Sequence, residues 1–343
     1  MKKHLAKVIA VSAIVALTFC SCSIGGKKLY FSTGLSKGEL FKIDGSSFNV
    51  SGAMLYLTTE KNLYERSYGS DIWDKDIGGV TLEEYVKENI KKHLAEIKTL
   101  NLLAKNKKVK LTDDEIAKAQ AAAEKYYSAL SEEEINYMNI TLKNVENAYK
   151  EYMLADKVYI ELTKDINPEI SDAEAKVIKV ASIYAKTYTI DAEGNRIEYT
   201  DEEKIKSKKG IQELLDEIKD GEDFITLAAN NTDADKVEYQ FGKGDMIEEF
   251  ESVAYSLKAD EVSELVETGD GYYVIKCISD YMENETDDRK EKMIQQEKDE
   301  YFNSIYTPFI DTLSSEFNDE VWKGITFKDM SDINVSNFYE CIK

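Results

Sequence analysis

Histidine, proline and cysteine are all scarce in this chain. Among 343 residues there are two histidines, two prolines and four cysteines. With so few prolines to interrupt it, the sequence suits long helices. A metal centre needs several His, Cys or carboxylate ligands brought together, and beyond the first residues only His93 remains among separated cysteines. The sequence therefore predicts neither a metal nor a cofactor, and His93 is expected to be a packed or half-buried side chain.

Basic residues are also fewer than acidic residues in this chain. The formal net charge is −22, and the lysines near the N-terminus make the remainder more acidic still. Such a surface repels phosphate backbones, which argues against nucleic acid as a partner. It is either a plain solubilising surface or one that attracts basic unfolded polypeptides. The sequence also contains no glycine-rich phosphate loop and no Cys–His pairing, so nucleotide-binding and cysteine-hydrolase functions have no support.

The N-terminus has the pattern of an export signal. A basic stretch, "MKKHLAK", precedes the apolar run "VIAVSAIVALTF", which is too short to cross a bilayer comfortably and is typical of a signal peptide. The "CSC" that follows resembles a bacterial lipobox, in which a cysteine is lipidated after the leader is removed. Cys22, preceded by the small Ser21, fits better than Cys20, preceded by Phe19. Residues 1–21 are then a signal peptide and 22–38 a lipidated tether, and the alternative is an ordinary secretory signal. Either one places the mature protein outside the cytoplasm.

Two cysteines lie after the signal peptide and the tether, Cys277 and Cys341. They form either a disulfide or two free thiols, and spacing alone does not decide between them. The free-thiol interpretation is favoured, because Cys277 lies in a predicted strand.

The first half of the chain is predicted to be helical. "FKIDGSSFNV" suggests a strand and a turn that lead to a second strand or a helix, and Ser51 is expected to cap a helix. Capping boxes, in which a hydroxyl and a glutamate satisfy free N–H groups at a helix start, then recur at Thr81–Glu84, Thr112–Glu115 and Ser131–Glu134. After the first box, apolar residues follow at spacings of three and four, which predicts one buried stripe: Leu82, Val86, Ile90, Leu94, Ile97 and Leu100.

The tyrosines of this half are numerous. They are interpreted either as a cradle for unfolded chains or as interhelical packing: Tyr85, Tyr126, Tyr127, Tyr137, Tyr149 and Tyr152.

A different pattern begins near Ser171, where another capping box opens the segment. Strand and helix signals then alternate in the order β-α-α-β-α-β-β, with glycines in the last turn. A long helix follows, from about residue 287 to 317, and Pro308 is expected to kink or split it. The remaining residues give a weak strand or loop signal and are treated as a tail.

Two stretches of this second region carry a family resemblance. "LLDEIKDGEDFITLAANNTD" and "GDMIEEFESVAYSLKADEVSELVETGDGYYVIK" resemble, in order and spacing, parvulin-type peptidyl-prolyl isomerase domains over about Val177–Tyr281. The flanking helical segments resemble the chaperone domain of extracytoplasmic foldases of the PrsA and SurA type.

The resemblance implies an α+β protein, in which a helical chaperone domain carries an inserted parvulin-like domain with a four-stranded sheet. The expected parts are an N-terminal helical domain at 39–170, the isomerase domain at 171–282, a C-terminal helix at 283–320 that completes the helical domain, and a tail at 321–343.

The resemblance also indicates candidate site residues. Parvulins usually carry two histidines in the site. Ser182 and Tyr273 stand at those two positions here, and Val237 stands near the position of a family acid or cysteine. Met246 and Phe250 keep the family's methionine–phenylalanine spacing. The resemblance thus implies catalytic roles for Ser182 and Tyr273 and a proline-binding role for Met246 and Phe250. Ordinary core packing is the alternative for each.

The function implied is that of a foldase lipid-anchored on the extracytoplasmic face of the cell membrane. Its partners would be unfolded or nascent exported polypeptides and their X–Pro segments, and the chain is compatible with a homodimer. Isomerase activity is uncertain and expected to be weak, because both usual histidines are absent. One alternative is a pure holdase or peptide-binding lipoprotein with an inactive parvulin fold. Another is a structural or solute-binding envelope lipoprotein.

Overall fold

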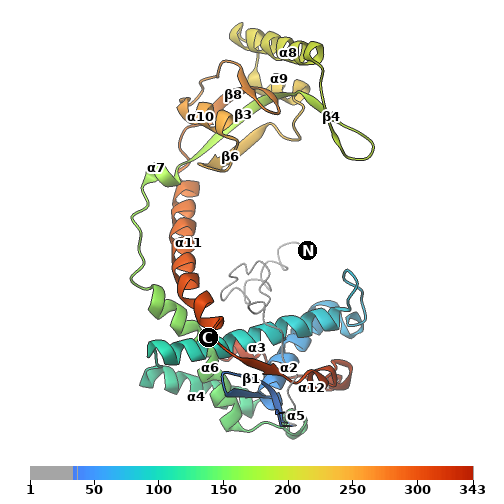
Figure 1. The fold of residues 1–343 in the computed structure, drawn as a ribbon, viewed down its shortest axis with the longest axis vertical. Coiled ribbons are helices and arrows are strands. Elements are labelled where there is room, and N and C mark those ends of the chain that lie inside the picture. Colours follow the sequence, from blue (N-terminus) through green and yellow to red (C-terminus); the bar gives the residue numbers. More distant parts are fainter. Residues whose placement is uncertain (1–33, 37, 343) are drawn as a thin grey trace. The chain divides into compact units, whose positions relative to one another are not determined.

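The computed structural model describes residues 34–36 and 38–342, so the predicted signal peptide and its cysteines lie outside the described residues. The chain forms two compact units (Figure 1). Unit 1 comprises the chain up to Asp165 together with the chain from Asp299 onward, and unit 2 comprises Ile166–Lys298. Unit 2 is therefore an insertion in the sequence of unit 1, with wider bounds than the predicted 171–282. The helix α11, Glu283–Ile310, begins in unit 2 and ends in unit 1.

Unit 1 opens with a β-hairpin, the strand–turn–strand form of the predicted alternatives. β1 (Glu39–Ile43) and β2 (Ser46–Asn49) pair antiparallel across Asp44 and Gly45, whose φ angles are 45° and 76°. Two left-handed residues give a turn whose twist matches that of the strands. β9 (Ser315–Phe317) pairs with the other edge of β1, so the sheet has the order β2-β1-β9.

The helices of unit 1 begin where the sequence predicts. All three capping boxes are formed, and Thr141–Asn144 adds a fourth. Ser51 is an exception, because the helix already begins at Val50 and Asn49 occupies the cap position without a capping side-chain bond. The helical elements of this part are α2 (Val50–Tyr68), the 3₁₀ turn η1 (Ser70–Ile72), α3 (Leu82–Lys107), α4 (Asp113–Ser128), α5 (Glu132–Met138) and α6 (Leu142–Thr163).

The core of unit 1 forms around the predicted apolar stripe of α3. Val86, Ile90, Leu94 and Ile97 are all buried, whereas Leu82 and Leu100 at the ends of the stripe are partly buried. The tyrosines differ in burial, and the structure bears on only the packing role. Tyr126 and Tyr149 are fully buried and serve packing, whereas Tyr85 and Tyr137 are exposed.

Residues 321–343 are not the tail that the sequence suggested. They contain α12 (Asp319–Lys323), η2 (Lys328–Met330) and η3 (Phe338–Glu340), and they place several apolar side chains in the core of unit 1. Phe338 stacks on Tyr149 with 4.1 Å between ring centroids, and the Tyr149 hydroxyl donates to the Phe338 carbonyl at 2.8 Å. Burial of one such ring contributes roughly 1.5–3 kcal/mol. The apolar residues of this segment are spaced too irregularly to predict a helix or strand, which is why local pattern missed them.

Unit 2 has the predicted order of elements, with one addition. They are α7 (Asp172–Ala175), β3 (Val177–Lys186), α8 (Asp201–Lys219), α9 (Phe224–Asn231), β6 (Glu238–Gly242), α10 (Glu248–Ser256), β7 (Val266–Thr268) and β8 (Gly271–Ser279). The four strands in this set form one antiparallel sheet in the order β6-β3-β8-β7. The addition is a separate hairpin of β4 (Tyr188–Ile190) and β5 (Arg196–Glu198), where the sequence suggested only a turn.

The predicted split at Pro308 does not occur. The helix α11 continues through this residue and ends two positions later, at Ile310. A proline in the last turn removes one helical N–H bond but leaves almost no helix beyond it to be displaced.

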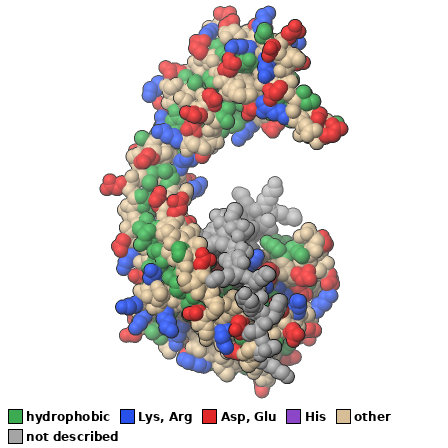
Figure 2. Space-filling model, in the orientation of Figure 1, with side chains coloured by type: hydrophobic (Ala, Val, Ile, Leu, Met, Phe, Trp, Pro, Cys, Tyr) green, Lys and Arg blue, Asp and Glu red, His purple; other side chains and the backbone are tan. Residues whose placement is uncertain are grey.

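Charged side chains of both signs are mixed over the visible face of both units (Figure 2). Within the described part of the chain, every helix is too short or too polar to cross a bilayer.

Candidate functional site

The candidate site of unit 2 is organised by the pairing of its two central strands. β3 and β8 are antiparallel, with Ser182 opposite Ile275 and Tyr184 opposite Tyr273. Opposed residues share a face of a sheet, and so do residues two apart along a strand. The side chains of Ser182, Tyr184 and Tyr273 therefore belong to one face of the sheet.

The two faces of this sheet are covered by different helices. Ala181, Ile183 and Val274 pack with side chains of α8 and α9 in one core cluster. The opposite face, to which Ser182 and Tyr273 belong, packs against α10. The predicted site residues thus share the α10 face, and the other face serves as an ordinary core.

Phe250 of α10 lies at the centre of the α10 face. Its ring packs against the rings of Tyr273, Phe241 and Tyr239, with centroid distances of 5.1, 5.9 and 6.3 Å. Met246 packs against the same cluster from the loop that precedes α10. The four residues predicted from the sequence, Ser182, Tyr273, Met246 and Phe250, are therefore brought to one face of the sheet.

Their exposure differs in a way that matters for ligand access. Ser182 is 0% exposed and Phe250 only 1%, whereas Met246, Tyr239 and Tyr273 are half-buried. A ligand approaching this face meets the methionine and the two tyrosines first. Phe250 lies behind them and supports their positions.

The loop that carries Met246 is fixed by charged residues from two helices. Arg289 of α11 binds Asp245 at 2.7 Å, and Asp245 also accepts from the backbone N–H of Gly242 at 2.9 Å. A β-carbon on Gly242 would overlap the Arg289 guanidinium, so a larger residue there would displace that side chain from its place beside the loop. Glu251 accepts from the Met246 N–H at 3.4 Å. These contacts hold the methionine in place.

Tyr239 is the site residue that the sequence analysis missed. It lies on β6, two residues before Phe241 and hence on the same face, and its hydroxyl donates to the Lys236 carbonyl at 2.9 Å. Burial raises the pKa of Tyr239, the charge of Asp235 adds to the rise, and the adjacent Ser182 hydroxyl acts in the opposite direction. The alternation of residues along β6 could have predicted that Tyr239 shares the face of Phe241. Tyr239 does not stand at a family histidine position, so the resemblance did not indicate it.

Tyr273 completes a set of hydroxyl groups on this face. Burial raises its pKa to about 12, and the neighbouring Tyr239 and Asp270 contribute to the same direction. Its ring stacks on Tyr184 at 4.5 Å, and the Tyr184 hydroxyl donates to the Asp270 carbonyl at 2.7 Å. Three hydroxyl side chains, those of Ser182, Tyr239 and Tyr273, thus stand beside the apolar ring of Phe250.

Val237, which the sequence placed near a family acid or cysteine, is not part of this set. Its carbonyl accepts from the Ser182 N–H at 2.9 Å, and its side chain packs in the cluster on the opposite face. Asp235 is instead the acid whose charge acts on Tyr239.

No described histidine lies on this face, and its cysteine, Cys277, lies opposite Val180, four residues along β8 from Tyr273. His93, in unit 1, is half-buried with its ring edge toward Tyr56, and burial lowers its pKa to about 4. Cys277 and Cys341 are both free thiols, the first of them buried. Within the described residues, no group of three or more His, Cys, Asp or Glu side chains could hold a metal ion.

The buried Ser182 hydroxyl lies close enough to Tyr239 to lower the pKa of that tyrosine, but it makes no hydrogen bond of ordinary geometry to any described residue. An unpartnered buried hydroxyl costs about 1–3 kcal/mol. We therefore expect Ser182→Ala to leave the local unfolding free energy of β3 and β8 unchanged or to raise it, as measured by hydrogen exchange in the full chain.

Thr286 offers a matched control, because it is equally buried but accepts from the Val177 N–H at 3.1 Å. Thr286→Ala should lower the same free energy by about 1–3 kcal/mol. An equal loss in both variants would show that Ser182 is a bonded structural serine and would contradict the assignment.

Comparison with known proteins relates this sheet to one family. Residues 190–279 match the family model of the rotamases, the PPIC-type PPIASE domain. The chain is 28% identical over 254 residues to the foldase protein PrsA of Caldanaerobacter subterraneus subsp. tengcongensis, covering 68% of this chain and 74% of that protein. It is 35% identical over 150 residues to the foldase protein PrsA of Halalkalibacterium halodurans, which is 41% of each chain.

A solved structure, that of the peptidylprolyl isomerase (PrsA) from Bacillus cereus, is 22% identical with a TM-score of 0.35 and covers 76% of this chain and 90% of that one. Residues 190–279 therefore match the PPIC-type PPIASE domain family, and the chain is similar to the PrsA foldases over most of its length.

Proposed function

We propose that this protein is a membrane-anchored extracytoplasmic foldase that binds unfolded exported polypeptides and isomerises their X–Pro bonds weakly. The observation that carries the proposal is the α10 face of unit 2. There Met246 and two tyrosines line the accessible surface in front of Phe250. Similarity to PrsA foldases over most of the chain supports the same role.

The chemistry asked of this face is modest. Rotation about an X–Pro bond breaks no covalent bond, and its barrier of about 18–20 kcal/mol comes from lost amide resonance. The twisted amide is less polar at its carbonyl than the planar one, so an apolar surface favours it, and positioned hydroxyl donors stabilise it further. Met246 and the rings of Tyr239 and Tyr273 would contact the proline. The Tyr273 hydroxyl would donate to the flanking carbonyl, whereas the Tyr239 hydroxyl already donates to the Lys236 carbonyl.

Weak activity follows from the burial of two residues. Phe250 and Ser182 are almost fully covered, so neither can contact substrate unless the tyrosines move. The same burial favours a second candidate function, a holdase whose isomerase fold only docks peptides. The two functions differ in whether bound X–Pro peptide is turned over.

The membrane location rests on the sequence of the leader. A lipid on Cys22, or on Cys20 as the alternative, would hold the protein on the extracytoplasmic face, where exported chains emerge unfolded. A single lipid chain gives marginal binding, so stable anchoring requires more than one chain.

Isomerisation of X–Pro peptides by the full chain tests the proposal directly. We expect acceleration above the spontaneous rate, measured by NMR exchange, and a loss of about tenfold or more in Tyr273→Phe, because the hydroxyl donor is removed while the ring remains. Tyr255→Phe is the matched control, since that hydroxyl donates at 2.6 Å to the Lys176 carbonyl and is thus engaged elsewhere.

The opposite result has a defined meaning. Exchange at the spontaneous rate, with peptide bound all the same, would reject the isomerase and leave the holdase. Activity undiminished in Tyr273→Phe would reject the assignment of that hydroxyl.

The pH profile of the same reaction should be flat. Unit 2 contains no histidine. Burial raises the pKa of Tyr273 to about 12, and burial also raises the pKa of Tyr239 above its ordinary value. A tyrosine is neutral below its pKa, so both hydroxyls keep their protons from about pH 6 to about pH 9. We expect kcat/KM to vary by less than about twofold over that range. A sigmoidal change centred near pH 6.5, the ordinary histidine value, would contradict the hydroxyl site.

The anchor is tested by metabolic labelling with a radioactive fatty acid. Cys22→Ser should abolish the label and release the protein from the membrane fraction, whereas Cys20→Ser should change neither. The reverse pattern would assign the lipid to Cys20, and label retained in both single variants would show that neither position alone is required.

A further inference from the structure

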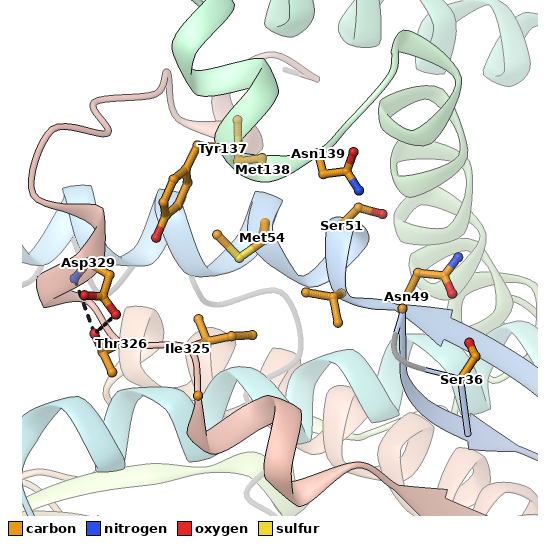
Figure 3. Close-up of a pocket in the computed structure, with 13 residues that line it drawn as sticks. Ser36, Asn49, Ser51, Met54, Tyr137, Met138, Asn139, Ile325, Thr326 and Asp329 are labelled. Carbon is orange, nitrogen blue, oxygen red and sulfur yellow. Dashed lines mark hydrogen bonds between the residues drawn. The ribbon is translucent and has the colours of Figure 1, made fainter. Parts of the chain in front are cut away.

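Unit 1 contains a pocket that no part of the isomerase site explains. Its volume is about 540 Å³, within the range of ligand-binding pockets, and all thirteen lining residues belong to unit 1 (Figure 3). The start of α2, the end of α5 and the segment that follows α12 form its walls.

One part of the pocket is apolar. Met54 of α2 and Met138 of α5 are buried in its wall, and Ile325 and Tyr137 point toward them (Figure 3). Tyr137 is 40% exposed, so its ring is accessible from solvent. Methionine adapts its shape to different apolar partners, and surfaces that bind many sequences use it for that reason.

The other part presents amide and hydroxyl groups. Figure 3 shows Asn49, Ser51 and Asn139 side by side across from the methionines. Their side chains form no hydrogen bond to other described residues and are available to a ligand. Asn139 is held in position by its left-handed backbone, with φ at 50°, which ends α5. Side-chain amides both donate and accept, as peptide backbones require.

Charge restricts the ligand further. Among the described residues that line the pocket, Asp329 is the one with a charged side chain, and its carboxylate accepts from the Thr326 hydroxyl at 2.7 Å. A negative group at the wall disfavours phosphate, nucleotide and carboxylate ligands. A neutral or basic ligand is favoured, in keeping with the acidic net charge of the chain.

The edge strand β2 ends at the wall of the pocket. β2 is the edge strand of the sheet β2-β1-β9, and its last residue, Asn49, lines the pocket. An extended polypeptide can add to such an edge while alternate side chains enter an adjoining pocket. This geometry suits a stretch of polypeptide better than a compact small molecule.

We propose that this pocket binds an extended, uncharged segment of an unfolded polypeptide, with one apolar side chain between Met54, Met138 and Ile325 and the backbone along Asn49 and Asn139. The inference rests on the proposed foldase function, and it locates a client-binding site on unit 1 that is separate from the isomerase domain.

The test uses the full chain and a short Gly/Ser peptide with one central leucine, labelled for fluorescence anisotropy. Ser51→Trp should fill the pocket, and Ile325→Asp should place a charge in its apolar part. Each should weaken binding of the peptide by about tenfold or more, the effect of losing one buried leucine. Replacing the peptide's leucine with aspartate should weaken binding to the wild type by the same factor.

Ile160→Asp is the matched control, because Ile160 is 53% exposed on α6 of the same unit and does not line the pocket. It should bind the peptide as the wild type does, and all three variants should keep the wild-type rate of X–Pro isomerisation. Affinity unchanged in both pocket variants would overturn the inference. So would a dimer in sedimentation that Ile325→Asp dissociates, because the occupant would then be a second copy of the chain.

Suppression of client aggregation, measured on the same variants, separates this inference from the proposed function. Loss of suppression in the two pocket variants alone supports both. Suppression unaffected by the pocket variants, with no peptide bound, leaves the foldase function and rejects the pocket. Peptide binding that depends on the pocket, in a chain that suppresses no aggregation, supports the pocket and rejects the foldase function.

Discussion

The antiparallel register between β3 and β8 determines where each candidate site residue of unit 2 points. With Tyr184 opposite Tyr273, the side chains of Ser182 and Tyr273 face α10, where Phe250 and Met246 lie. A slip of β8 by one residue would turn Tyr273 away from Ser182 to the face covered by α8 and α9, among closely packed aliphatic side chains. The register is specified by burial, because both faces of the sheet are covered and each accepts only its own set of side chains.

Tyrosine in place of histidine changes what this face can do. A histidine titrates near neutral pH and can exchange protons, whereas Tyr239 and Tyr273 remain neutral and offer a ring together with a hydroxyl. The rings cover Phe250 and stabilise the sheet. The Tyr239 hydroxyl donates to the Lys236 carbonyl, and the Tyr273 hydroxyl remains as the donor near the surface. Packing and the proposed ligand contact thus depend on the same side chains, so stability is gained at the expense of access to the phenylalanine. This arrangement supports the proposal of a peptide-binding surface with weak turnover.

Much of the fold could be predicted from local pattern, and the failures have a common cause. Capping boxes such as Thr81–Glu84 and Thr200–Glu203, and the stripe of α3, depend on residues three or four apart, so the sequence displays them directly. The C-terminal segment was taken for a tail because Phe338 is buried by Tyr149, a contact between residues far apart in the chain. The candidate site followed from family spacing, which located Met246 and Phe250. Tyr239 has no family histidine to mark it, and the burial of Phe250 depends on rings from other strands.

The central claim is that the chain holds unfolded polypeptides chiefly by their apolar segments and isomerises proline only weakly. Its most direct test is the suppression of aggregation of one client in two forms, the natural sequence and a variant in which every proline is replaced by alanine. The account predicts equal suppression of both forms, because binding does not require proline. Suppression lost with the proline-free client would contradict it and would make the isomerase domain the main site of client recognition.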